Sequence, residues 1–211
     1  PAILKKHGYD VNRIVDYHLF SLLEQDAPDL CADRVDYTLR EWVGEEKMCY
    51  KNVEVRDGRM VFGDEPSALK FGRIYTELQS TDWGSTGARH RYQTIAFALN
   101  RAMRLGIIQF DDFWKDDEYI LERLQNSRDE QILKCIEILS QKDLSWLPTT
   151  EEVAHHKFRH IDPMYIRADG SLGRLSENVS EYFDELEQAR SISERGNNSV
   201  DLERCLKDDA Q

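Results

Sequence analysis

Apolar residues recur at every third or fourth position through most of this chain, and that spacing favours α-helices over strands. The pattern predicts helices over residues 9–25, 28–43, 68–78, 88–105, 112–124, 129–141 and 176–189. Because 40% of the residues are hydrophobic, the chain carries enough apolar surface to enclose a core. The sequence therefore predicts a mainly α-helical fold in which strands are minor.

The clearest strand signal is a hairpin over residues 53–62, Val-Glu-Val-Arg-Asp-Gly-Arg-Met-Val-Phe. Asp57-Gly58 at its centre is typical of a type I′ turn. Pairing across this turn sets Val53 against Phe62. We expect the resulting small sheet to cap the helices.

At 211 residues, the chain has the length of one domain, or of one domain and a fragment. Residues 1–144 predict a helical region that contains the hairpin. Residues 145–175 are richer in Pro, Gly and Thr and predict an extended or β appendage, with short strands at 157–161 and 164–166. Residues 176–211 predict a C-terminal helix followed by a polar tail.

The chain is acidic, with 40 Asp and Glu against 28 Lys and Arg, a net charge of −12. This charge opposes binding to extended nucleic acid, whose affinity comes from clustered Lys and Arg, so a nucleotide ligand needs a local basic patch. The sequence has no run of about 18 apolar residues and no signal-peptide pattern. Its four cysteines are scattered, without C-x-x-C spacing. We expect a soluble cytoplasmic protein with reduced thiols and no membrane partner.

The predicted helix over residues 28–43 sorts its side chains onto two sides at about 100° per residue. The apolar side consists of Cys31, Val35, Leu39 and Trp42. The polar side consists of Asp33, Asp36, Tyr37 and Arg40, with Glu41 at its edge. Such a polar side is typical of a surface helix that meets solvent, with Asp36 and Arg40 as an i,i+4 ion pair.

The same segment, Cys-Ala-Asp-Arg-Val-Asp-Tyr-Thr-Leu-Arg-Glu over residues 31–41, resembles the D-[KR]-x-D-Y-x-x-R-[DE] helix of HD-domain phosphohydrolases. Deoxynucleoside triphosphate triphosphohydrolases are the nearest biochemically understood proteins of this kind. The resemblance implies an HD-type helical domain that holds a divalent metal and cleaves a nucleotide or related phosphoester. It places Asp33 where the last metal ligand belongs and Arg34 where a basic residue faces substrate phosphate.

The resemblance extends to four further residues of this helix. It gives Tyr37 the place of an aromatic residue lying along the sugar, and Glu41 that of a carboxylate near the sugar hydroxyl. Asp36 and Arg40 resemble supporting ion-pair residues. An octahedral divalent cation such as Mn, Fe, Ni or Mg suits carboxylate and imidazole ligands, and it can activate water for attack on phosphorus.

The chain departs from the HD pattern in one respect, because it contains no His-Asp dipeptide. HD proteins take three metal ligands from a His and an adjacent His-Asp pair, and these ligands cannot be located here. The chain also begins at Pro1 without an initiating Met. We expect it to be the C-terminal part of a longer HD protein, with the missing segment upstream or in a companion chain, and to be inactive alone.

The alternative function is a non-catalytic HD-like module for binding or assembly. An H…HD pattern upstream, or in a companion chain, would favour the enzyme. The acidic C-terminal helix also leaves pairing with a second copy of the chain open.

One other segment offers histidines at metal-ligand spacing. His156 and His160 would share a metal on a helix. The neighbouring Phe158, Ile161 and Pro163 instead favour an extended basic strand, on which positions four apart lie too far from each other for one ion.

The densest basic patch comprises Arg89, His90 and Arg91 at the start of a predicted helix, with Arg101 and Arg104 further along it. A phosphate could bind there, because a helix start presents free N–H groups. The pattern favours instead a solvated face, or ion pairs with the acidic run at residues 111–118.

Overall fold

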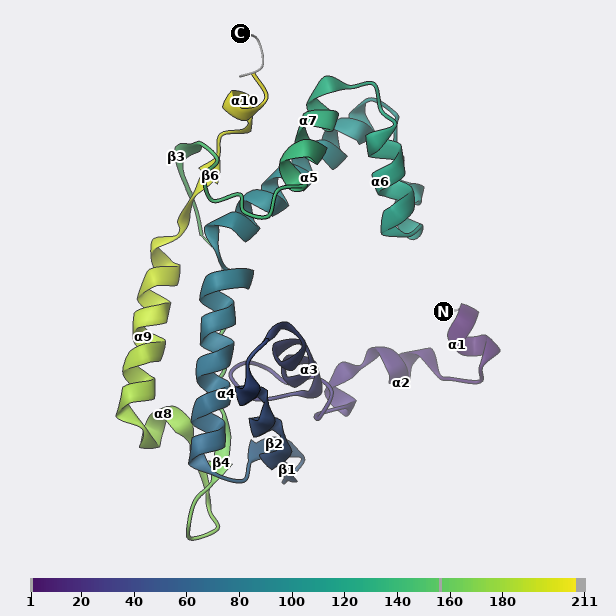
Figure 1. Cartoon of the computed structure of the whole chain (residues 1–211). Helices are drawn as coiled ribbons and strands as arrows, with labels where there is room; N and C mark the ends of the chain where they lie inside the picture. The colour runs from purple at the N-terminus through teal and green to yellow at the C-terminus, as the bar shows by residue number, and fades with distance from the viewer. Residues whose placement is uncertain (1, 156, 208–211) are drawn as a thin grey trace. The chain divides into compact units, whose positions relative to one another are not determined.

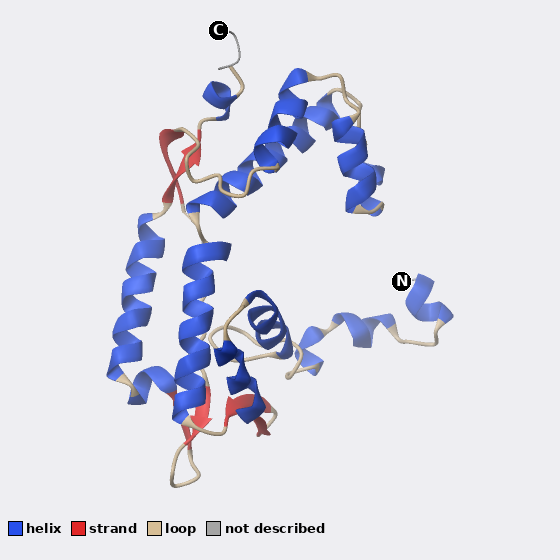
Figure 2. Cartoon of the chain, in the orientation of Figure 1, coloured by secondary structure: helices blue, strands red, loops and turns tan. Residues whose placement is uncertain are grey.

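The computed structural model of the chain describes residues 2–155 and 157–207. Helices dominate and the strands are short (Figures 1 and 2), which confirms the predicted mainly α-helical fold with a small hairpin. The residues form two compact units. The first unit comprises Pro1–Thr81 and Lys157–Ser193, and the second comprises Asp82–His156 and Glu194–Gln211. Among the described residues, every helix is too short or too polar to cross a lipid bilayer.

The first unit begins with short helical pieces instead of the predicted helix over residues 9–25. These are α1 (Ala2–Lys6), α2 (Val11–Val15) and a 3-10 turn, Tyr17–Leu19. The helix prediction is wrong because Asp16 ends α2 and its carboxylate accepts a hydrogen bond from the His18 N–H, which starts the 3-10 turn.

Helix α3 (Ala32–Glu41) carries the motif and begins four residues later than predicted. The preceding residues are held by distant parts of the chain. Leu30 forms a β-bridge with Met60, and the Pro28 carbonyl accepts a hydrogen bond from the Asp162 N–H at 2.9 Å. The Asp29 carboxylate pairs with guanidinium groups of the sheet, those of Arg59 at 3.1 Å and Arg174 at 2.7 Å.

The predicted hairpin is confirmed, with β1 (Val53–Arg56) antiparallel to β2 (Arg59–Phe62) and Val53 opposite Phe62. Asp57 and Gly58 have φ of 50° and 72°, as a type I′ turn requires. The 3-10 segment Glu45–Asn52 precedes the hairpin.

Two later strands extend the hairpin into a four-stranded sheet with the order β1-β2-β4-β5. Strand β4 (Met164–Ile166) runs parallel to β2 and antiparallel to β5 (Leu172–Arg174). The predicted strand at 164–166 is therefore confirmed, whereas residues 157–161 form no regular strand.

Helix α4 (Glu65–Leu78) supplies the core of the first unit, with Phe71 and Tyr75 buried. It lies beside α9 (Ser180–Arg195), as Figure 1 shows, and the Arg73 guanidinium donates to the Glu185 carboxylate at 2.6 Å. The short helix α8 (Leu175–Asn178) precedes α9. A π-helical turn, Gln79–Trp83, follows α4.

The second unit packs α5 (Thr86–Arg104) against α6 (Asp117–Gln125) and α7 (Glu130–Leu139). A 3-10 turn, Phe110–Trp114, replaces the first part of the helix predicted over 112–124. The buried core of these helices contains Ala102, Ile108, Leu124 and Ile132. Strand β3 (Thr149–Ala154) pairs antiparallel with β6 (Asn197–Val200), and α10 (Leu202–Cys205) follows.

Candidate functional site

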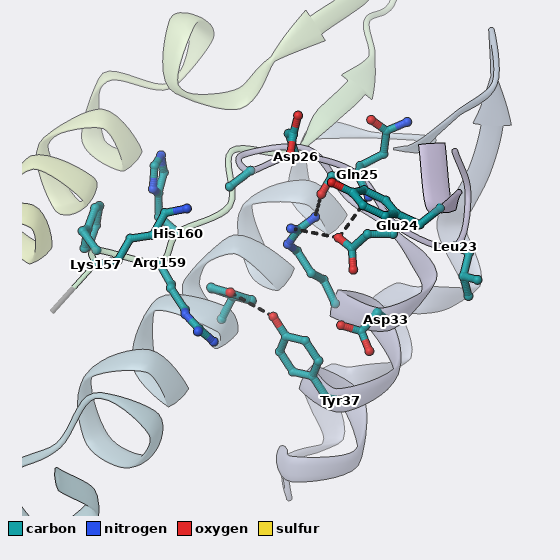
Figure 3. Close-up of a pocket in the computed structure, with 14 residues that line it drawn as sticks. Leu23, Glu24, Gln25, Asp26, Asp33, Tyr37, Lys157, Arg159 and His160 are labelled. Atoms are coloured by element: carbon teal, nitrogen blue, oxygen red, sulfur yellow. Dashed lines mark hydrogen bonds and ion pairs between the residues drawn. The ribbon is translucent and has the colours of Figure 1, made fainter. Parts of the chain in front are cut away.

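The first unit contains a cavity of about 720 Å³ beside the N-terminal half of α3 (Figure 3). Four parts of the unit line it: Tyr17 of the 3-10 turn, α3 with the loop before it, Tyr75 of α4, and the extended segment 157–160. The lining residues are Tyr17, Leu23, Glu24, Gln25, Asp26, Ala27, Asp33, Arg34, Tyr37, Tyr75, Lys157, Phe158, Arg159 and His160. The motif residues Asp33, Arg34 and Tyr37 thus come together on one wall.

Asp33 lies in the first turn of α3, and its exposed side chain lines the cavity. Its carboxylate forms no hydrogen bond or ion pair with the part of the chain that the structure describes. The position is favourable for a negative charge, because the first turn of a helix presents the positive end of the helix dipole. Asp33 therefore offers an uncommitted carboxylate to a cation.

Arg34 uses its guanidinium to hold the loop before α3. Its Nη1 donates to the carbonyl of Gln25 at 2.6 Å and to that of Asp29 at 3.0 Å. Its Nη2 donates to Glu24 Oε1 at 3.3 Å. The side chain is 15% exposed. Both hydrogens of Nη1 are therefore committed within the protein, and a phosphate contact through that nitrogen would have to displace a backbone carbonyl.

Tyr37 lies one turn after Asp33, and its hydroxyl is 3.0 Å from that of Tyr75. Burial first, and then the hydrogen bond with Tyr75, raise the pKa of Tyr37 above that of an ordinary tyrosine. The hydroxyl therefore stays protonated at neutral pH, so it can orient a ligand but cannot act as a general base. The pair also ties α3 to α4.

The remaining motif residues, Asp36, Arg40 and Glu41, do not line this cavity. Asp36 and Arg40 form an ion pair along α3 with their side chains 63% and 73% exposed. That geometry is the surface pair expected of an amphipathic helix. Glu41 is exposed at the last position of the helix.

The segment 157–160 lines the cavity opposite α3. The motif at residues 31–41 does not predict this contribution. The rings of Phe158 and His160 stack at 4.9 Å, and the Arg190 guanidinium lies 5.0 Å from the Phe158 ring centre. Burial lowers the pKa of His160, as does the nearby Arg190, so the imidazole is neutral at neutral pH. The signal for this wall was the basic alternation Lys-Phe-Arg-His at 157–160.

The histidine pair considered as a metal site is not tested as a pair, because His156 lies outside the described residues. His160 belongs to a segment, residues 157–160, that is not helical.

Three arginines of the basic patch of α5 bind groups inside the second unit. Arg89 donates to the Ala154 carbonyl at 2.6 Å, and Arg91 donates to the carbonyls of Leu139, Gln141 and Lys142 at 2.8, 3.0 and 3.3 Å. The Arg101 guanidinium binds both oxygens of Asp129, at 2.6 and 2.7 Å. Arg91 and Arg101 therefore bind backbone carbonyls and Asp129, and among the described residues they do not pair with the acidic run at 111–118.

A complete metal site requires several converging donors. Within the described ranges, no three His, Cys, Asp or Glu side chains come together in a way that could hold a metal ion. Glu24, Asp26 and Asp33 all line the cavity without forming such a group. The described residues therefore do not fit a metal ion by themselves, although Asp33 could serve as one ligand.

Two curated proteins are similar to this chain. A Bacillus subtilis protein, described as uncharacterized protein YdhJ, is 33% identical over 144 residues, which cover 64% of this chain and 44% of that protein. The metal-dependent phosphohydrolase cns2 of Cordyceps militaris is 25% identical over 177 residues, covering 77% of this chain and 51% of that protein. The chain thus spans about half the length of the curated relatives it matches. No family model and no solved structure matches it.

Proposed function

We propose that this chain forms part of an HD-type, metal-dependent phosphohydrolase in which Asp33 is a metal ligand. The observation that carries the proposal is the uncommitted Asp33 carboxylate, which faces a cavity of about 720 Å³ together with Arg34 and Tyr37. The relative named metal-dependent phosphohydrolase supports the same class of reaction. The metal would be divalent, with Mn, Fe, Ni and Mg as candidates.

The other metal ligands would come from outside this chain. One carboxylate cannot hold a divalent cation tightly, and no second and third donor converge on Asp33 among the described residues. The relatives are about twice as long as the matched stretch. We therefore propose that an H…HD segment, upstream or in a companion chain, completes the site, and that the chain alone is inactive.

The substrate in this proposal is a nucleotide or a related phosphoester. Tyr37 and Tyr75 together offer a ring face and a protonated hydroxyl on the cavity wall, which suits a sugar. Glu41, for which the motif implied a contact with the sugar hydroxyl, lies outside the cavity lining. A substrate contact by Glu41 therefore needs either a longer ligand or a different helix end in the complete protein.

A second candidate is a non-catalytic binding or assembly module. It is favoured by one observation, the lack of a converging three-donor group within the described ranges. In that case Asp33 and Tyr37 would bind a ligand without turnover.

Metal analysis and phosphate release distinguish the two functions. The full-length protein is purified, its Mn, Fe, Ni and Mg content is measured, and phosphate release is followed with a panel of nucleotides. We expect stoichiometric metal and turnover in the wild type. Asp33→Asn should reduce both by at least about 100-fold, since it removes a charged ligand without changing the side-chain volume.

Asp184→Asn is the matched control, because Asp184 is an exposed carboxylate of the first unit outside the cavity lining. It should retain metal and turnover, and both variants should unfold as cooperatively as the wild type. A wild type that stays metal-free and inert both as the full-length protein and together with any companion chain that carries an H…HD segment would exclude the enzyme and leave the binding module.

A further inference from the structure

The positive charges that line the cavity differ in whether they are available to a ligand. Three permanently charged cations line it: Arg34, Lys157 and Arg159. The fourth basic side chain, His160, is neutral at neutral pH because burial lowers its pKa. An anionic ligand therefore has three candidate charges to bind.

Arg34 is the least available of the three. Its guanidinium already donates to the Gln25 and Asp29 carbonyls and pairs with Glu24. A bound anion could use only the Nε–H and the second N–H of Nη2 unless it displaced these partners. Arg34 therefore acts as a positioning residue for the loop before α3.

Lys157 and Arg159 are available. Both side chains are exposed, and neither forms a hydrogen bond or ion pair with the residues that the structure describes. In Figure 3 the Arg159 side chain extends from its segment toward Tyr37. What sets these two cations apart from other exposed basic side chains is that both line the same cavity wall, where their unused donors can bind an external anion.

The segment that carries these cations is fixed by its alternate residues. Phe158 stacks on His160, and Arg190 lies over the Phe158 ring. Ile161, which follows, is buried, and its carbonyl accepts a hydrogen bond from the Tyr182 hydroxyl at 2.8 Å. The backbone of Lys157 and Arg159 is therefore held in place while their charged ends remain at the cavity.

We infer that Lys157 and Arg159, and not Arg34, bind the phosphate chain of the anion that occupies this cavity. The inference deepens the proposed function and rests on it for the identity of the substrate. A phosphate chain fits because several oxygens can each accept from a separate N–H group, and a guanidinium matches two of them at once. Asp33 lines the same cavity from the α3 wall, so a phosphate chain held by these cations would also face the proposed metal ligand.

The test measures binding without turnover. The full-length protein in EDTA is titrated with inorganic tripolyphosphate by calorimetry, in parallel with a nucleoside triphosphate and the corresponding nucleoside. We expect tripolyphosphate to bind, and Arg159→Gln and Lys157→Gln each to weaken that binding about tenfold. If the nucleoside triphosphate binds more tightly than tripolyphosphate by a factor unchanged in both variants, the natural ligand is a nucleotide whose phosphates alone meet these cations.

Matched controls remove an equal charge elsewhere in the first unit. Arg13 and Lys51 are exposed and lie outside the cavity lining, so Arg13→Gln and Lys51→Gln should bind tripolyphosphate as the wild type does. Equal losses in the controls would show a general charge effect and overturn the inference. Wild-type affinity in Arg159→Gln and Lys157→Gln, or absence of binding in the wild type, would overturn it as well.

The experiment also separates this inference from the proposed function. Asp33→Asn should abolish phosphate release yet keep tripolyphosphate binding in EDTA, because it removes a negative charge and no anion contact. If the wild type binds tripolyphosphate through Arg159 but releases no phosphate from any nucleotide, the phosphohydrolase proposal fails and the anion site remains.

Discussion

Two groups of basic residues in this molecule differ in whether their N–H donors already have partners within the protein. The group on α5 is the densest in the sequence, yet Arg89, Arg91 and Arg101 all donate to carbonyls or to Asp129 within the second unit. Lys157 and Arg159 are only two residues, yet they line a cavity, and their side chains have no hydrogen-bond or ion-pair partner among the described residues. A cation is therefore available to a ligand only where the fold leaves its donors unused, which the local density of charge does not indicate.

The largest effect is expected from Arg91, one of the three arginines of α5 that bind groups within the second unit. Arg91→Gln removes charge-assisted hydrogen bonds to the carbonyls after α7, and we expect the free energy of unfolding to fall by roughly 2 to 3 kcal/mol. Chemical denaturation measures this change. Arg104→Gln is the control on the same helix, with an exposed side chain and an expected change within about 0.5 kcal/mol. Equal stability of the two variants would contradict the assignment of Arg91 to structure.

Arg34 shares a feature with each group. It lines the cavity, as Lys157 and Arg159 do, but its guanidinium binds protein groups, as those of the α5 arginines do. Arg34→Gln should lower the free energy of unfolding by about 2 kcal/mol and increase amide exchange in the loop at residues 24–29. Arg159→Gln should leave both unchanged within about 0.5 kcal/mol. An effect of Arg159→Gln as large as that of Arg34→Gln would place Arg159 in the structure instead of the site.

The Arg101–Asp129 pair gives a smaller effect that depends on pH. The hydrogen bond from Arg101 holds the pKa of Asp129 below its usual value, so this stabilisation is full above the ordinary aspartate pKa and is lost as the pH falls through the lower folded value. Arg101→Gln should therefore lower Tm at pH 7, and its difference from the wild type should shrink by pH 3. Thermal unfolding at pH 7, 5 and 3 measures it. A difference that stays constant with pH would show that the pair contributes through packing alone.

The exposed Asp36–Arg40 pair should matter least. Arg40→Gln is expected to change the free energy of unfolding by about 0.3 kcal/mol, and high salt should remove even this difference. Denaturation in low and high salt measures it. A loss above about 1 kcal/mol would indicate that Arg40 supports the motif helix beyond a surface contact.

The features predicted correctly from sequence are those set by near neighbours. The hairpin register follows from Asp57-Gly58 alone, and the i,i+4 spacing places Asp33 and Tyr37 on one side of a helix. The start of α3 could not be predicted, because contacts with residues 60 and 162 hold the chain before it in a non-helical conformation. The helix over residues 9–25 failed because side-chain capping at Asp16 outweighed apolar periodicity.

For the candidate site, too, the parts set by near neighbours in the sequence could be predicted and the parts set by distant residues could not. Its acidic wall was visible in the motif, but the wall at 157–160 lies more than a hundred residues away in the sequence and meets α3 only through the fold. The role of Arg34 was also beyond sequence reasoning, because the carbonyls of Gln25 and Asp29 decide where its guanidinium points.

The attachment of Asp29 to Arg174 has a consequence for biosynthesis. Two anchors of the loop before α3 are made long after the loop itself, since Asp162 and Arg174 leave the ribosome well over a hundred residues later. The nascent chain can form α3 and the contacts of Asp29 and Leu30 with β2 early, but it cannot complete the attachment of this loop until β5 has emerged. A ribosome stalled ahead of that strand would therefore carry α3 and Asp33 on a loop that still lacks its contacts with Asp162 and Arg174.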